Sequence, residues 1–233
     1  MRWKFILGLL TTCAVLMSMS YTMLIPFLPM YLIQDLGVVK ADVDMWSGAI
    51  FAITFLVSGI MAPIWGALAD KKSRKLMALR AGFCLAITYF LGGLVTNPWE
   101  LLGVRFIQGL SAGLWPALLA IISVESPKLK LGFCLGVMQG GMTAGGVLGP
   151  LFGGLLADQF GMRMAFFIAA AALFLITLAL LFFVKEEPRK PDPNAKPVKI
   201  WDFSLCRIPA VKRMLICAGV VQLTILMQQP IMP

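Results

Sequence analysis

Histidine is absent from this chain of 233 residues, and charged residues make up only 13% of it. The commonest general acid–base group and metal ligand of enzymes is therefore missing. The five cysteines form no C-x-x-C pair, so neither a disulfide framework nor a zinc site is indicated. At 60% hydrophobic residues, the chain carries more apolar surface than a water-soluble domain of this size can bury. We expect no cofactor and no metal, and a lipid bilayer as the surroundings.

Six apolar segments are long enough to cross a bilayer, which takes about 20 residues of helix. They cover residues 5–33, 46–69, 76–95, 99–124, 131–157 and 164–184. We therefore expect an all-α integral membrane protein whose residues 1–184 form a six-helix bundle. A proline-rich, charged cytoplasmic linker would follow over residues 185–213. A seventh transmembrane helix over residues 214–233 would then begin a second bundle that is absent from this chain.

The lysines and arginines are distributed unevenly over the loops between these segments. With the N-terminus in the cytoplasm, seventeen of the twenty lie on the cytoplasmic side and two, Lys40 and Arg163, on the other. Cytoplasmic loops of membrane proteins carry such an excess. We expect a cytoplasmic N-terminus, and we interpret the net charge of +9 as a sign of topology rather than of a nucleic-acid partner.

Two short segments, 88 residues apart, resemble each other. The sequence G-A-L-A-D ends the second span at residues 66–70, and G-L-L-A-D ends the fifth at residues 154–158. These spans run in opposite directions, so the echo predicts two inverted three-helix repeats; chance is the alternative in a chain rich in Gly, Ala and Leu. A weaker echo relates P-x-x-P at residues 26–29 to P-x-x-P at residues 230–233, which favours a seventh helix that begins a second half.

The loop between the second and third spans reads G-A-L-A-D-K-K-S-R-K over residues 66–75. It resembles the signature loop of the major facilitator superfamily, where charged residues hold the cytoplasmic helix ends together in one state and release them in another. The resemblance implies gating roles for Gly66, Asp70, Lys71, Arg74 and Lys75, with Glu125 as the acid that pairs with Arg74. Ser73 departs from the glycine that is usual in the family. The alternative is that these charges only set the membrane topology.

Arg105 is the only charged residue well inside a span. A buried arginine costs at least about 2.5–3.5 kcal/mol in a membrane, so it needs a wet cavity or a partner; snorkelling to the outer interface is the alternative. The surrounding L-x-x-x-R-x-x-Q-G, residues 101–109, resembles the superfamily motif whose arginine is assigned to proton coupling. We group five residues as candidates for proton coupling or the cavity wall: Arg105, Gln108, Tyr21, Thr22 and Gln139.

The fifth span has small residues every four positions from Gly141 to Ala157, a spacing that allows close contact between helices. Part of it resembles the motif that distinguishes drug:proton antiporters from other transporters of the superfamily. That motif comprises Gly145, Gly149, Pro150, Gly153 and Gly154. The resemblance implies a bent face that seals the two halves of the transporter against leak; packing alone is the alternative.

The whole chain thus resembles the N-terminal half, plus one helix, of a drug:proton antiporter. The resemblance implies efflux of small amphipathic compounds in exchange for protons across the cell inner membrane, without enzymatic activity. The partners would be a small-molecule substrate, protons, the lipid bilayer and the missing C-terminal half. Four alternatives remain open: a sugar or metabolite transporter of the same fold, a membrane-embedded enzyme, a half-transporter that works as a homodimer, and a non-functional truncated fragment.

Overall fold

The computed structural model describes residues 2–71 and 73–184, together with seven helical residues between Val211 and Val220. The chain divides into two units, Met1–Pro191 and Asp192–Pro233. Most of the predicted linker and seventh helix lies outside the described residues, and so do the side chains of Asp70 and Lys71. The predicted boundaries of these parts remain predictions.

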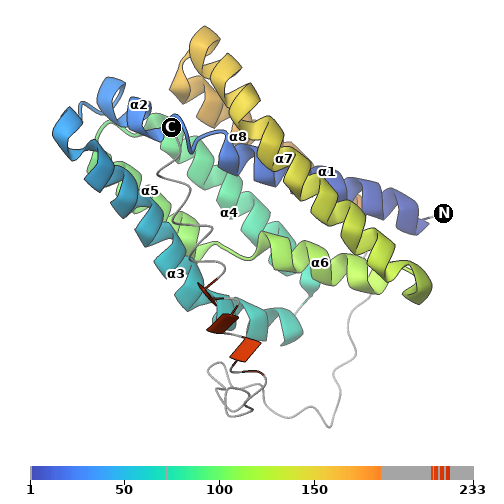
Figure 1. Ribbon diagram of the computed structural model, residues 1–233. Coiled ribbons are helices and arrows are strands. Elements are labelled where there is room, and N and C mark those ends of the chain that lie inside the picture. Colours follow the sequence, from blue (N-terminus) through green and yellow to red (C-terminus); the bar gives the residue numbers. More distant parts are fainter. Residues whose placement is uncertain are drawn as a thin grey trace. The chain divides into compact units, whose positions relative to one another are not determined.

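The first unit consists of helices that are long and apolar enough to cross a membrane (Figure 1). The described residues contain six such spans. They are formed by α1 (Arg2–Thr22), α3 (Val43–Lys71), α4 (Arg74–Leu94), α5 (Pro98–Leu110) with α6 (Leu114–Glu125), α7 (Leu131–Phe160) and α8 (Met162–Phe183). The predicted all-α membrane fold is confirmed.

The first predicted span, residues 5–33, consists of two helices rather than one. α1 ends at Thr22, turns follow, and the short helix α2 covers Leu28–Gln34. Inside a helix a proline ring clashes with the carbonyl four residues earlier, which for Pro26 is the carbonyl of Thr22. Pro29 occupies the first turn of α2, where no backbone donor is needed.

The fourth predicted span, residues 99–124, is also broken, between α5 and α6. Pro116 lies in the first turn of α6, and the carbonyl with which its ring would clash in a continuous helix belongs to Ala112. Gly113 follows with a φ of 119°, in the left-handed region that glycine adopts without a steric penalty. The break therefore follows from a glycine and a proline three residues apart in the sequence.

The spans pack in a pattern with two-fold character. The most extensive contacts join α1 to α7, α4 to α8, and α3 to α5, and Figure 1 shows α1 and α7 side by side. The α1–α7 contact joins the first and fifth spans, the α3–α5 contact joins the second and fourth, and the α4–α8 contact joins the third and sixth. Exchanging the first three spans for the last three turns the first of these contacts into the second and leaves the third unchanged. Two inverted three-helix repeats require this pattern.

The glycines of α7 allow it to approach the backbone of α1. A Cβ added at Gly145 would overlap the backbone of Val15, and one at Gly153 would lie 2.5 Å from the carbonyl oxygen of Met23. The helix continues through Pro150, which faces outward from the described bundle. One face of the small-residue ladder therefore packs the fifth span against the first.

We expect Gly145→Ala to destabilise the protein by about 1–3 kcal/mol, because the added methyl group must push α7 away from α1. The matched control is Gly136→Ala on the same helix, where an added Cβ meets no atom of the described structure within 4 Å. That change should be neutral or stabilising by up to about 1 kcal/mol, since alanine is the better helix former. Denaturant unfolding in detergent measures both, and equal effects would contradict the packing role.

Candidate functional site

The candidate site is built around Arg105 and Gln108, which lie three residues apart on one face of α5. Nη1 of Arg105 donates a hydrogen bond to Oε1 of Gln108 at 3.0 Å. The two residues are only 5% and 8% exposed. In the described part of the chain no carboxylate lies within 4.0 Å of the Arg105 guanidinium. A neutral amide holds the charge inside the bundle, which favours a buried arginine over one that snorkels to the outer interface.

The second span supports this turn of α5 from behind. Thr54 on α3 donates from its hydroxyl to the carbonyl of Ile50 at 2.9 Å and lies 3.4 Å from the carbonyl oxygen of Arg105. A Cβ added at Gly109 would lie 2.8 Å from the Thr54 carbonyl oxygen. Gly109 therefore allows α5 to touch the α3 backbone directly after Gln108.

A cavity of about 250 Å³ lies beside Gln108. We call it the central cavity, and its polar lining comprises Ser18, Tyr21, Thr54, Ser58, Tyr89, Gln108 and Ser111. Its apolar wall includes Met17, Phe55, Leu85, Trp115 and Met142. Among the described residues the buried hydroxyl of Tyr21 has no hydrogen-bond partner. Aromatic and methionine walls with a few polar groups suit an amphipathic ligand.

Two predicted cavity residues lie elsewhere. Thr22 donates its hydroxyl to the Ser18 carbonyl at 2.9 Å and packs against α7, where a Cβ at Gly149 would overlap it. Gln139 is exposed on α7, and its backbone carbonyl accepts a hydrogen bond from Thr143 at 3.0 Å. Neither lines the central cavity, and Arg105 is not in its lining either but contacts Gln108, which is. The functional roles of all three remain predictions.

Tyr89 and Trp115 line the cavity but are absent from the sequence prediction. Tyr89 carries a usable signal, since it is one of only three tyrosines in the chain and lies inside an apolar span. Trp115 carries no such signal, because the break after α5 places it there.

The loop predicted to act as a cytoplasmic gate joins α3 to α4. Ser73 is the N-cap of α4, and its hydroxyl accepts a hydrogen bond from the amide of Leu76 at 3.0 Å. Lys75 donates to the backbone carbonyl of Leu181, near the end of α8, at 2.6 Å. Arg74 and Gly66 line a second cavity of about 250 Å³, which we call the inner cavity.

The remaining predicted gating residues are placed only in part. Glu125 is the last residue of α6, and its pairing with Arg74 remains a prediction. Asp70 and Lys71 belong to the last turn of α3, and their side chains lie outside the described residues. In the antiporter motif of α7, Gly154 approaches the ring of Phe27, at 3.2 Å from an added Cβ.

At the opposite end of the bundle, an ion pair that the sequence analysis did not anticipate links α2 to α8. Nε of Arg163 lies 3.2 Å from a carboxylate oxygen of Asp35. Nη2 of the same arginine donates to the backbone carbonyl of Val95 at 3.4 Å. One side chain thus connects the ends of the first, third and sixth spans.

Membrane-spanning helices in inverted repeats, arranged around a polar-lined cavity, define the fold class of membrane transporters. The sequence profile of the Major Facilitator Superfamily matches residues 10–231. The chain belongs to this family of transporters, which is not a family of enzymes.

Relatives in the same family carry a more specific name. The chain is 43% identical over 186 residues to the "Multidrug resistance protein MdtG" of Citrobacter koseri, covering 79% of this chain and 46% of that protein. It is 41% identical over 187 residues to the protein of the same name from Yersinia enterocolitica, covering 80% of this chain and 45% of the relative. The chain spans about half the length of the curated relatives it matches.

Solved structures of low sequence identity support the fold. A bacterial homologue of the human lysosomal transporter Spinster, in an inward-facing conformation, matches with a TM-score of 0.70 at 23% identity, over 88% of this chain and 48% of that one. The POT family transporter PepTSo matches with a TM-score of 0.68 at 14% identity, over 81% of this chain and 40% of that one.

We expect Ser73→Ala to destabilise the start of α4 by about 0.5–2 kcal/mol, since it removes the side-chain cap. Ser73→Gly, which introduces the residue usual in the family, should cost only a few tenths of a kcal/mol. Hydrogen exchange at the first amides of α4 and denaturant unfolding measure the two changes. A larger effect of the glycine variant would contradict a capping role.

Proposed function

We propose that the chain is part of a full-length transporter that expels small amphipathic compounds from the cell in exchange for protons. The observation that carries the proposal is the buried Arg105–Gln108 pair beside a cavity with aromatic, methionine and hydroxyl walls. The relatives named as multidrug resistance proteins support the substrate class. The protein would lie in the cell inner membrane with its N-terminus in the cytoplasm.

Proton coupling follows from the isolation of the Arg105 charge. In a site of low dielectric, a fixed positive charge attracts a carboxylate far more strongly than it does in water. Protonation of that carboxylate removes the attraction and so changes the balance between two conformations. We propose that the carboxylate comes from outside the described residues, because no described acid faces Arg105 within 4.0 Å.

The gating loop and the antiporter motif of α7 complete the proposal. The bases Lys71, Arg74 and Lys75 and the acids Asp70 and Glu125 would hold the cytoplasmic ends of the helices together in one state, with Glu125 as the partner of Arg74. Gly149 and Pro150 would belong to the face that seals the two halves against leak. Transport assays in inverted membrane vesicles test the proposal. Proton symport would contradict the antiport mechanism, and transport of sugars alone would contradict the substrate class.

We expect Arg105→Ala, in a full-length version of the protein, to lower proton-driven efflux by about tenfold or more. The reason is that the alanine variant loses the buried charge that contacts Gln108 in the wall of the central cavity. Arg105→Lys keeps the charge but not the planar guanidinium, so it should retain part of the activity. Dye efflux driven by an imposed pH gradient measures this, with exposed Lys40→Ala as the control. Unchanged efflux in Arg105→Ala would refute the coupling role.

The 233-residue chain expressed by itself should confer no drug resistance, since it spans about half the length of its relatives. Binding cavities of this fold lie between two six-helix bundles, and the chain supplies one of them. Growth of a drug-sensitive strain over a concentration series of several amphipathic drugs tests the expectation. Resistance that rises with expression of the chain alone, or a transport-competent homodimer trapped by crosslinking, would contradict it.

A further inference from the structure

The break in the fourth span leaves backbone carbonyls without helical partners inside the bundle. Within lipid or a packed bundle, such groups must find a partner in protein or cavity water. The carbonyl of Leu110 accepts a hydrogen bond from the indole nitrogen of Trp65 on α3 at 2.8 Å. The carbonyl of Ala112 accepts one from Nη2 of Arg80 on α4 at 2.9 Å. Two different spans thus hold the two sides of the break.

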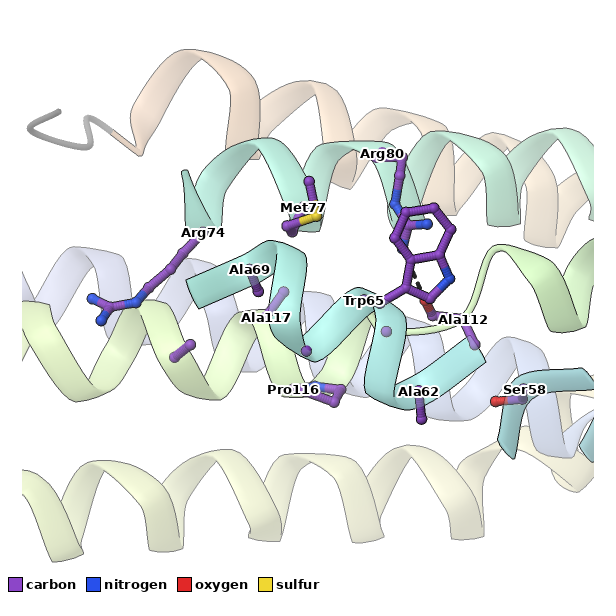
Figure 2. Close-up of a pocket in the computed structure, with 13 residues that line it drawn as sticks. Ser58, Ala62, Trp65, Ala69, Arg74, Met77, Arg80, Ala112, Pro116 and Ala117 are labelled. Atoms are coloured by element: carbon purple, nitrogen blue, oxygen red, sulfur yellow. Dashed lines mark hydrogen bonds between the residues drawn. The ribbon is translucent and has the colours of Figure 1, made fainter. Parts of the chain in front are cut away.

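Trp65 and Arg80 also contact each other. The guanidinium carbon of Arg80 lies 3.4 Å from the centroid of the Trp65 ring, which is close cation–π stacking. Figure 2 shows the two side chains stacked beside Ala112, with the hydrogen bond from Arg80 drawn. We call Trp65 and Arg80 the clamp. An arginine suits this place because its planar group can stack and donate at the same time.

The clamp lies where the two cavities meet. The inner and central cavities share four lining residues: Ser58, Ala112, Gly113 and Pro116. Trp65 and Arg80 line only the inner cavity, on the side that also contains Arg74 and Met77. The central cavity continues instead to Gln108, the partner of Arg105.

In sequence, the clamp residues lie on either side of the loop between α3 and α4. Trp65 directly precedes Gly66, and Arg80 follows Arg74 by six residues. A shift of the cytoplasmic end of α3 relative to α4 therefore changes the geometry of the stack. The stack holds the carbonyls of Leu110 and Ala112, which follow Gln108 by two and four residues. Such a shift is therefore transmitted through these two hydrogen bonds to the turn that contains Arg105 and Gln108.

We propose that Trp65 and Arg80 are positioning residues, which transmit a shift of α3 relative to α4 to Arg105 and Gln108 and close the central cavity toward the inner one. The proposal rests on the proposed transport function for its consequence, but the closure of the cavity is independent of transport.

The first test measures closure in the 233-residue chain, in inside-out membrane vesicles and with its five cysteines replaced by serine. Met142→Cys, at a residue that lines only the central cavity, reports the labelling rate with a membrane-impermeant thiol reagent. Leu85→Cys, which also lines only that cavity, is a second reporter. Arg80→Gln and Trp65→Leu should each raise the rate about fivefold or more, the lower end of typical coupling between sites. The double variant should add little, because both residues act on one break.

The matched control is a second tryptophan–cation pair, Trp3 and Lys130, whose ammonium nitrogen lies 5.4 Å from the ring centroid. Trp3→Leu and Lys130→Gln should leave labelling unchanged. Arg80→Lys, which keeps a donor for the Ala112 carbonyl, should bring the rate back toward that of the parent. A monodisperse size-exclusion profile in detergent, measured for each variant, shows that it folds. An unchanged rate in Arg80→Gln, an equal rise in the control pair, or fully additive clamp effects would overturn the proposal.

The second test separates positioning from general structural support in a full-length version. Arg80→Gln should lower proton-driven efflux about fivefold or more while leaving the equilibrium Kd for the transported compound within about twofold. An equal loss of binding and efflux would overturn the positioning role. If the unsubstituted protein expels no amphipathic compound, the proposed function fails, and the labelling rates alone decide the clamp.

Discussion

The satisfaction of backbone polar groups inside the bilayer is the constraint on which the described structure depends. A helix satisfies it without help, but the fourth span stops after Leu110 and starts again at Leu114. The freed carbonyls accept hydrogen bonds from the indole nitrogen of Trp65 and from Nη2 of Arg80. A break that would be costly in lipid is stable here because two neighbouring spans complete it.

Close packing of glycine against backbone is the complementary device. Gly145 and Gly153 let α7 approach α1, and Gly109 lets α5 approach α3. These two contacts are equivalent in the inverted-repeat arrangement. Exchanging the first three spans for the last three turns the contact between the first and fifth spans into the contact between the fourth and second. The hydrophobic effect offers little between helices in lipid, so close van der Waals contact and hydrogen bonds hold such a bundle together.

The Arg105–Gln108 pair depends on both devices. Gly109, which follows Gln108, allows α5 to pack against Thr54. The helix then ends at Leu110, so the Arg105–Gln108 pair lies in the last turns of α5, next to the break. The Arg105 guanidinium has one amide partner and no described carboxylate within 4.0 Å, which supports the proposal that an acid from outside the described residues pairs with it. This is the feature that fits a coupled transporter better than a purely structural arginine, because a structural arginine would be expected to have its donors paired internally.

The sequence by itself determined the six spans that the described residues contain and the family, and it favoured inverted repeats, because hydrophobic length and short motifs are local properties. The seventh span stays a prediction. It also located Arg105 and Gln108, since a charge inside an apolar run is visible without a structure. Only the tertiary structure placed Thr22 and Gln139 outside the central cavity and brought Tyr89 and Trp115 into it. Gly113 and Pro116 are visible in the sequence, but the partners of the carbonyls at the break are not. Arg80 lies 32 residues from Ala112, and Trp65 lies 45 residues from Leu110. Those distances are bridged by packing between spans, which no local pattern encodes.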